Sequence, residues 1–161
     1  AIWAIIDNAE PGVPLVDQMN AASRSLGLTQ TYFLNETGLD YGPSVSGAYG
    51  SARDVAVLFK HALATLGPAL EATSDVEFSI TSNEFLHTAR NTNDAISSIP
   101  GLIAGKTGFT DLAGGNLVVA FDAGLNNPII IVVLGSTYEG RFADVRRLVA
   151  GVFDALSGES S

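Results

Sequence analysis

The residues with the clearest chemical potential lie in Gly101–Phe109, where an apolar run leads into Lys106-Thr107-Gly108-Phe109. Lys106 supplies a positive charge and Thr107 a hydroxyl group, and both groups can bind a carboxylate. Gly108 has no Cβ atom, so another chain could lie close against the backbone there. A peptide that ends in a carboxylate could therefore pair with this segment as an added β-strand.

Two other interpretations apply to the same residues. The first is an ordinary edge strand with a solvated lysine and a turn glycine. The second is a phosphate-binding loop, because Gly105-Lys106-Thr107 matches the end of that motif. The motif needs a glycine where Pro100 stands, and no helical pattern follows Thr107 to hold phosphate at a helix N-terminus. Nucleotide binding is therefore set aside.

The composition indicates one globular domain with a substantial core, since the 161 residues are 47% hydrophobic and 16% charged. A net charge of −9 argues against binding to nucleic acid or to an anionic membrane surface. The chain has no cysteine, which excludes disulfides, thiolate metal sites and cysteine nucleophiles. His61 and His87 have no partners at metal-ligand spacing, so no metal or cofactor is expected.

The apolar spacing predicts an α+β fold in which helices pack on an antiparallel sheet. Ser51 and Asp54 have the types expected for a helix cap and first turn, and Gly67-Pro68 predicts the end of that helix. Helices are expected at 1–6, 14–26, 51–66 and 142–156, and strands at 29–34, 76–80, 102–109, 116–121 and 129–134. The last three strands are joined by short connections, as in a meander. Residues 83–99 show no clear pattern.

Several polar residues are interpreted as structural or solvated. Asn35, Gly38 and Asp54 fit turn and cap positions, and Trp3 fits a core. Asp75, Glu77 and Glu84 are expected to be solvated carboxylates. The chain begins with Ala1 in an apolar, helix-like run rather than with methionine or a signal peptide, so we expect it to start inside a domain.

Taken in order, these segments resemble the serine D-alanyl-D-alanine carboxypeptidases. These are low-molecular-mass penicillin-binding proteins, and they share their fold with class A β-lactamases. The resemblance covers nearly the whole chain. The matching segments are Asp17–Asn20, Thr31–Leu39, Ser51–Ala56, His87–Asn93, Gly105–Thr110, Ala113–Leu117, Val133–Ser136 and Arg141-Phe142.

The resemblance implies a reaction in which a serine attacks the penultimate D-alanine of a peptidoglycan stem peptide, and water then releases the acyl-enzyme. It implies that Lys106 supplies positive potential and assists proton movement, and that the Phe109 backbone N–H is an oxyanion-hole donor. It assigns Thr107 and Arg141 to the substrate carboxylate and Gly108 to close approach of the peptide. β-Lactams are the second expected ligand.

Two of the family's three catalytic motifs are missing from this sequence. No serine is followed by lysine three positions later or by asparagine two positions later. By resemblance, both motifs lie upstream of Ala1. We therefore expect residues 1–161 to be a partial catalytic domain that lacks the N-terminal part of the fold. Such a chain would be inactive alone and would have an exposed sheet edge.

Other functions remain open at this point. The same fold carries D,D-transpeptidases and β-lactamases, and a non-catalytic peptide-binding or scaffold module could retain the Lys-Thr-Gly strand without the serine. Location in the cell envelope, periplasmic or extracytoplasmic, follows from the resemblance alone. Membrane association is expected only through segments that this sequence does not contain.

Overall fold

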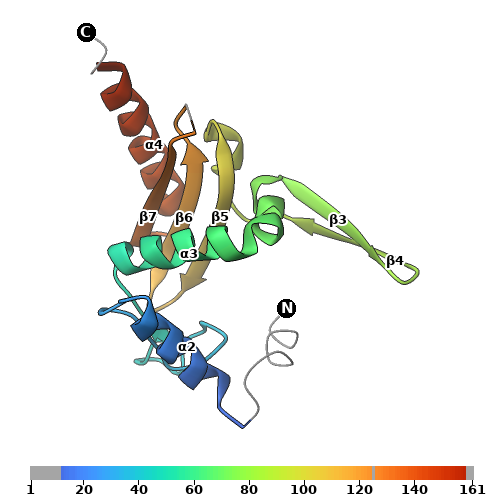
Figure 1. Cartoon of the computed structure of the whole chain (residues 1–161), viewed down its shortest axis with the longest axis vertical. Coiled ribbons are helices and arrows are strands. Elements are labelled where there is room, and N and C mark those ends of the chain that lie inside the picture. The colour runs from blue at the N-terminus through green and yellow to red at the C-terminus, as the bar shows by residue number, and fades with distance from the viewer. Residues whose placement is uncertain (1–11, 125, 159–161) are drawn as a thin grey trace.

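The computed structural model describes residues 12–124 and 126–158, and its centre is an antiparallel sheet between two helices (Figure 1). The sheet has three strands in the order β5-β6-β7, which are β5 (Leu102–Thr110), β6 (Gly114–Asp122) and β7 (Pro128–Ser136). Helix α3 (Ala52–Glu71) covers one face, and helix α4 (Gly140–Gly158) covers the other. The predicted α+β class and the antiparallel meander are confirmed.

Strand β6 contributes to two hydrophobic cores because it is the middle strand of the sheet. Leu117, Val119 and Phe121 belong to the core under α4. Val118 and Ala120 belong to the core under α3, as the alternation of side chains along a strand requires. Each of the five is at most 7% exposed. Covering both faces explains why this segment is an unbroken apolar run rather than an alternating one.

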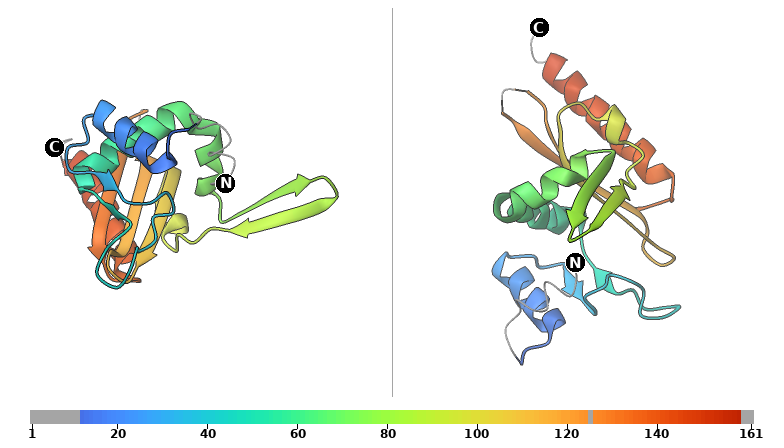
Figure 2. Two further views of the ribbon diagram at one scale, coloured as in Figure 1. Left: turned by 90° about the horizontal axis from the view of Figure 1, so that it is seen from below. Right: turned by 90° about the vertical axis from the view of Figure 1, so that its right-hand side faces the viewer.

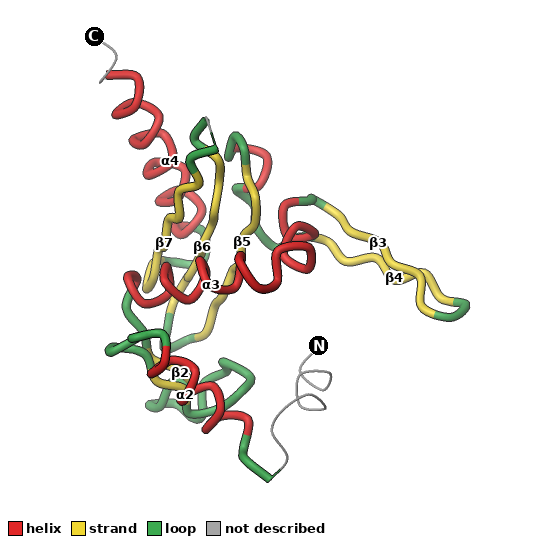
Figure 3. The backbone as a smooth tube through the Cα atoms, viewed as in Figure 1, coloured by secondary structure: helices red, strands yellow, loops and turns green. Residues whose placement is uncertain are grey.

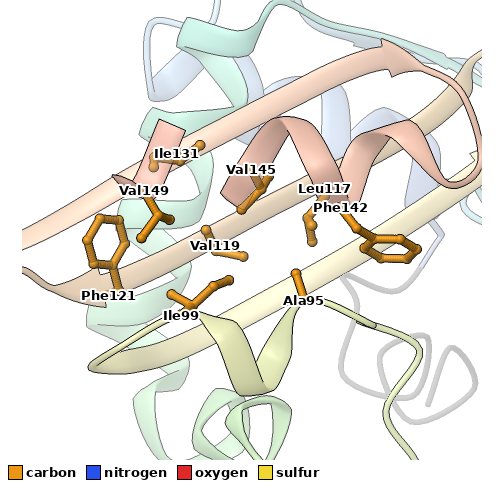
Figure 4. Close-up of a cluster of buried hydrophobic side chains, with 9 residues drawn as sticks. All are labelled: Ala95, Ile99, Leu117, Val119, Phe121, Ile131, Phe142, Val145 and Val149. Atoms are coloured by element: carbon orange, nitrogen blue, oxygen red, sulfur yellow. The ribbon is translucent and has the colours of Figure 1, made fainter. Parts of the chain in front are cut away.

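Helix α4 was predicted from its apolar spacing, and this prediction is confirmed. Phe142, Val145 and Val149 recur at helical intervals and form the buried face of the helix (Figure 4). Ala95 and Ile99 close the same core from the segment that holds the short helix η2 (Ile96–Ser98). Burying one such large aliphatic or aromatic side chain contributes about 1.5–3 kcal/mol. The β-strands are thereby held firmly against α4.

Helix α3 begins as predicted but ends later than predicted. Ser51 is the N-cap, and its Oγ accepts a hydrogen bond of 3.2 Å from the N–H of Asp54. The end predicted at Gly67-Pro68 is wrong, because the helix continues to Glu71 across non-helical angles at Leu66 (φ −120°, ψ 17°). Proline lacks an N–H but is tolerated in the first turn of a helical segment. The dipeptide therefore breaks the helix without ending it.

A smaller layer holds helix α2 (Leu15–Ser25) and the two-residue strands β1 (Tyr32–Phe33) and β2 (Ala48–Tyr49). The buried Asn20 side chain ties α2 to β1. Its Nδ2 donates to the Phe33 carbonyl at 2.8 Å, and its Oδ1 accepts from the Phe33 N–H at 2.8 Å. The amide thus pairs with the backbone as a neighbouring strand would.

Asp54 connects this layer to the start of α3. Its carboxylate is 1% exposed, and Oδ2 accepts hydrogen bonds from the Gln30 N–H at 2.8 Å and from Thr31 Oγ1 at 3.0 Å. Asn35 Oδ1 accepts from the Gly38 N–H at 2.9 Å within the predicted turn. The structural roles expected for Asp54, Asn35 and Gly38 are therefore confirmed, and Asp54 has the additional long-range contacts.

The most exposed element is a hairpin of β3 (Glu77–Ser82) and β4 (Phe85–Arg90), which projects away from the sheet (Figures 1 and 2). The strand predicted at 76–80 corresponds to β3. Strand β4 lies in the stretch for which no element was predicted, and its turn places Asn83 at a positive φ of 50°. Figure 3 shows that a loop and the short helix η1 (Ala72–Ser74) join this hairpin to the body.

Some expectations fall outside the described residues, namely the helix at 1–6 and the core position of Trp3. Asp75, Glu77 and Glu84 are exposed, as expected for solvated carboxylates. Among the residues described, no helix combines the length and hydrophobicity needed to cross a membrane.

We predict that Asn20→Ala lowers the free energy of unfolding by about 2–4 kcal/mol, because it leaves the Phe33 N–H and carbonyl without partners. Urea denaturation of the 161-residue chain, followed by circular dichroism, measures this change. Ser25→Ala is the matched control on the same helix, since Ser25 is exposed and its hydroxyl bonds only within the helix. A loss for Asn20→Ala no larger than that for Ser25→Ala would contradict the prediction.

Candidate functional site

The Lys-Thr-Gly segment lies on β5, which is an edge strand of the sheet. The Gly105 N–H points away from β6, because it donates to Thr73 Oγ1 at 3.0 Å. Backbone groups alternate in direction along an antiparallel strand, so the N–H groups of Thr107 and Phe109 point to the same open edge. The middle of β5 therefore presents backbone donors and acceptors to which an added strand could pair.

The side chains of Lys106 and Thr107 leave β5 on opposite faces of the sheet. Ala104 is buried in the core under α3, so Lys106, two residues later, faces the α3 side. Lys106 is exposed, and its Nζ donates to the carbonyl oxygen of Thr107. Thr107 and Phe109 face the α4 side. The positive charge and the hydroxyl thus approach the open edge from two directions.

Arg141 lies in the first turn of α4 and is only 3% exposed. Its Nη1 donates to the Gly108 carbonyl at 2.8 Å. The guanidinium lies between two rings, with Cζ 4.5 Å from the Tyr138 centroid and 4.6 Å from the Phe142 centroid. Both distances are within the range of cation–π attraction. Its Nε has no hydrogen-bond partner, and no carboxylate in the described part of the chain forms an ion pair with it.

An aromatic contact connects Arg141 to the exposed end of the site. The Phe109 ring is 44% exposed and meets the Tyr138 ring edge to face, with centroids 5.1 Å apart. Tyr138 in turn lies over the guanidinium of Arg141. This stack fixes the Phe109 side chain on the α4 face of β5, which leaves its backbone N–H at the open edge.

Gly108 is not required by the packing of the protein itself. A Cβ atom at this position would come no closer than 3.8 Å to any protein atom, the nearest being the Cβ of Asn116. At Gly115 on β6, by contrast, a Cβ would lie 2.1 Å from the Thr137 carbonyl oxygen. The fold therefore needs glycine at 115 but not at 108, and the space beside Gly108 remains open to a ligand.

All five residues singled out from the sequence line one cavity of about 520 Å³. They are Lys106, Thr107, Gly108, Phe109 and Arg141. Residues 37–39 also line this cavity. Within the described chain, no cluster of three or more histidine, aspartate or glutamate side chains is arranged to bind a metal ion. His61 and His87 are both exposed and far apart in sequence, and His87 bonds to Ser82 on the hairpin.

The sequence assigned no site role to three further residues, although Thr92 lies in the matching segment His87–Asn93. Asp40 accepts hydrogen bonds from Thr110 Oγ1 at 2.9 Å and from the Leu112 N–H at 3.2 Å. These bonds connect the loop 37–39 to the end of β5. Tyr138 and Thr92, unlike Asp40, line the cavity itself. These contacts join positions far apart in the chain, and no local pattern marks them. For Asp40, the only sequence feature that could have indicated a role was its position directly after the turn that ends at Gly38-Leu39.

The comparison with protein families identifies the family of this chain. The profile of the D-alanyl-D-alanine carboxypeptidase family matches residues 11–137. The chain belongs to this family. The resemblance found in the sequence is therefore confirmed.

Curated relatives give the same assignment. The D-alanyl-D-alanine carboxypeptidase DacB2 of Mycobacterium tuberculosis is 34% identical over 125 residues, which are 78% of this chain and 42% of that protein. The carboxypeptidase DacA of Haemophilus influenzae is 33% identical over 153 residues, covering 92% of this chain and 37% of that protein. The chain thus spans less than half the length of these two relatives.

Solved structures share the architecture. Penicillin-binding protein D2 of Listeria monocytogenes, in an ampicillin-bound form, has a TM-score of 0.71 at 30% identity, covering 84% of this chain and 54% of that one. A mutant DD-transpeptidase of Streptomyces has a TM-score of 0.68 at 25% identity, covering 87% of this chain and 54% of that one. The fold is therefore that of a penicillin-binding D,D-peptidase, matched over about half of each solved chain.

We predict that Gly108→Ala leaves the free energy of unfolding within about 1 kcal/mol of wild type, because the added methyl group meets open space and alanine lowers the entropy of the unfolded chain. Gly115→Ala is the contrasting variant. Its methyl group would overlap the Thr137 carbonyl, so a loss of at least about 2 kcal/mol is expected. Thermal and urea unfolding of both variants measure the difference. Equal losses in the two variants would show that Gly108 is a packing residue.

Proposed function

We propose that this chain forms the substrate-recognising part of a serine-type D-alanyl-D-alanine carboxypeptidase, which removes the terminal D-alanine from peptidoglycan stem peptides. Family membership supports this proposal. The observation that carries it is Arg141, a buried cation beside the cavity with no carboxylate partner among the described residues. Removing a charge from water costs several kcal/mol. An unpaired buried guanidinium at a cavity therefore indicates an anionic ligand.

Thr107 and Arg141 are proposed to bind the substrate carboxylate together. Both approach β5 from the α4 face, and both line the same cavity. A hydroxyl and a guanidinium are hydrogen-bond donors suited to carboxylate oxygens, and charge-assisted bonds of this kind are stronger than neutral ones. The stacking of Tyr138 and Phe142 on the guanidinium fixes its position before the ligand arrives.

The position of the carboxylate determines where the reacting carbonyl lies. A peptide that runs antiparallel to β5 with its carboxylate at Thr107 places the carbonyl of its penultimate residue near Phe109. The Phe109 N–H points to the open edge and can donate to the oxygen that becomes negative during attack. Losing one such donor costs about 10²–10³ in rate. Exposed Lys106 adds positive potential beside the same carbonyl.

In the proposed reaction, a serine oxygen bonds to the carbonyl carbon, the bond to the terminal D-alanine nitrogen breaks, and water later hydrolyses the acyl-enzyme. This sequence contains neither Ser-x-x-Lys nor Ser-x-Asn. We therefore expect the 161-residue chain to bind ligands without being acylated. β-Lactams would acylate the same serine in the complete protein. Because peptidoglycan is the substrate, a cell-envelope location is part of the proposal.

A D,D-transpeptidase is the second candidate, because the DD-transpeptidase of Streptomyces matches 87% of this chain. The two activities differ in the acceptor that releases the acyl group. Water gives the shortened peptide, and an amine gives a new peptide bond. Mass spectrometry of products formed by the complete protein with and without added D-amino acids separates the two reactions.

We predict that benzylpenicillin forms one covalent adduct with the protein read from its natural start codon and none with the 161-residue chain. The physical reason is that Lys106, Thr107 and the Phe109 N–H can orient and polarise the β-lactam, whereas this sequence contains no Ser-x-x-Lys to supply an activated serine. Intact mass measures both products. An adduct on the 161-residue chain would identify one of its own serines as nucleophilic. No adduct on either form would favour a non-catalytic peptide-binding module.

We predict that Arg141→Met weakens binding of N-acetyl-D-alanyl-D-alanine to the 161-residue chain by about 10- to 100-fold, as expected for a lost charge-assisted hydrogen bond. Replacing a buried charge by an apolar side chain of similar length is often neutral for stability, so the variant should remain folded. Chemical-shift titration measures the affinity. Arg146→Met, on the exposed face of the same helix, is the matched control. Equal affinities of wild type and both variants would show that Arg141 does not bind the carboxylate.

A further inference from the structure

We propose that Thr92 is a positioning residue, which directs the Thr107 hydroxyl toward the substrate carboxylate. This inference rests on the proposed function, in which Thr107 binds that carboxylate. The two hydroxyl oxygens are 2.7 Å apart, the usual separation for an O–H···O hydrogen bond, and either hydroxyl could be the donor. Neither hydroxyl has another hydrogen-bond partner in the described part of the chain.

The backbone around Thr92 is held firmly, so its side chain can serve as a fixed reference. On one side, the Asn91 N–H donates to the Val76 carbonyl at 2.9 Å. The Asn91 side-chain Nδ2 donates to the carbonyl groups of Thr73 at 2.8 Å and Asp75 at 3.0 Å. These bonds attach the segment to the base of the hairpin and to η1.

On the other side of Thr92, the Asn93 N–H donates to Asn91 Oδ1 at 2.9 Å, and Asn93 Oδ1 accepts from the Ala95 N–H at 3.0 Å. Asn93 is 3% exposed and Ala95 is fully buried in the core under α4. The segment is thus anchored to the body of the domain at both ends. Thr92, exposed between these anchors, directs its hydroxyl to Thr107 rather than to a backbone group.

Proton counting then sets the direction of the hydrogen bonds. A hydroxyl has a single proton to donate and can accept at its lone pairs. When Thr107 donates to a carboxylate, it can no longer donate to Thr92 and must accept from it. Thr92 therefore donates to Thr107, and Thr107 donates to the ligand. Such a chain strengthens each bond and removes rotamers of Thr107 that face away from the ligand.

The position of Thr92 agrees with this role. Thr92, Lys106 and Thr107 line both the cavity that contains Arg141 and a second cavity of about 280 Å³ at the base of the hairpin. Thr92 therefore lies where the two cavities meet, beside the place assigned to the carboxylate. A residue here can act on the ligand through Thr107.

The test compares wild type with Thr92→Val, which removes the hydroxyl and keeps a β-branched side chain, and with Thr92→Ser, which restores the donor. Each chain is titrated with N-acetyl-D-alanyl-D-alanine and with its C-terminal amide. We expect Thr92→Val to lose about three- to tenfold in affinity for the acid, with little change for the amide. Thr92→Ser should recover most of the loss. Thr88→Val, on the exposed hairpin, is the matched control.

A second measurement needs no ligand. Three-bond scalar couplings from the Thr107 Cγ2 to the backbone nitrogen and carbonyl carbon report its χ1 rotamer. Wild type and Thr92→Ser should show one rotamer, and Thr92→Val should show averaged couplings. A single Thr107 rotamer in Thr92→Val, or an unchanged preference for acid over amide, would overturn the inference. A third outcome separates the two proposals. If wild type binds the acid no better than the amide, but Thr92→Val still changes the Thr107 couplings, the proposed function fails and the contact between the two threonines stands.

Discussion

The open edge of β5 is the constraint on which the rest of the structure depends. An unpaired strand edge invites uncontrolled pairing with other chains, and proteins usually cover or interrupt it. Here the edge is covered at both ends, and between them Lys106 Nζ of the same strand donates to the Thr107 carbonyl. Thr73 satisfies the Gly105 N–H, and Asp40 binds Thr110 and the Leu112 N–H. The open part is therefore confined to the stretch around Thr107–Phe109, where the candidate site lies.

The sheet behind this edge supplies the rigidity that such a site needs. Strand β6 is buried on both faces, so β5 is held by a strand that cannot move without disturbing two cores. Arg141 adds a direct connection from α4 to the Gly108 carbonyl. A guanidinium in this place satisfies less of its hydrogen-bonding capacity than a surface arginine would. That deficit is typical of sites that are organised for a ligand rather than for stability alone.

The sequence predicted best the elements whose side chains follow a period. The meander, α4 and the Ser51 cap were found because apolar spacing and cap chemistry act within a few residues. Strand β4 was missed because it is exposed on both faces and has no apolar alternation to detect. The continuation of α3 past Pro68 was missed because proline is compatible with the first turn of a new segment as well as with a helix end.

The candidate site divides in the same way between what was predictable and what was not. Lys106, Thr107 and Gly108 stand in one short motif, and the resemblance added Phe109 and Arg141. The contacts that orient them could not be read from the sequence. Thr92 meets Thr107 across 15 positions, and Asp40 meets Thr110 across 70. Single hydrogen bonds between polar residues that are distant in the sequence leave no periodic pattern, so they can be identified only in the folded structure.

In the proposed function, the carboxylate-binding side chains and Lys106 lie on opposite faces of β5. Thr107 and Arg141 would bind the carboxylate on the α4 side, and the Phe109 N–H, which would act in bond cleavage, lies at the open edge. Lys106 faces the α3 side, where the described residues place no serine with the spacing of the family's nucleophile. If Thr107 and Arg141 bind the carboxylate as proposed, this binding can be measured in the present chain separately from acylation. In most acyl-transfer enzymes, substrate binding and acylation are observed together, and their energetic contributions are difficult to separate.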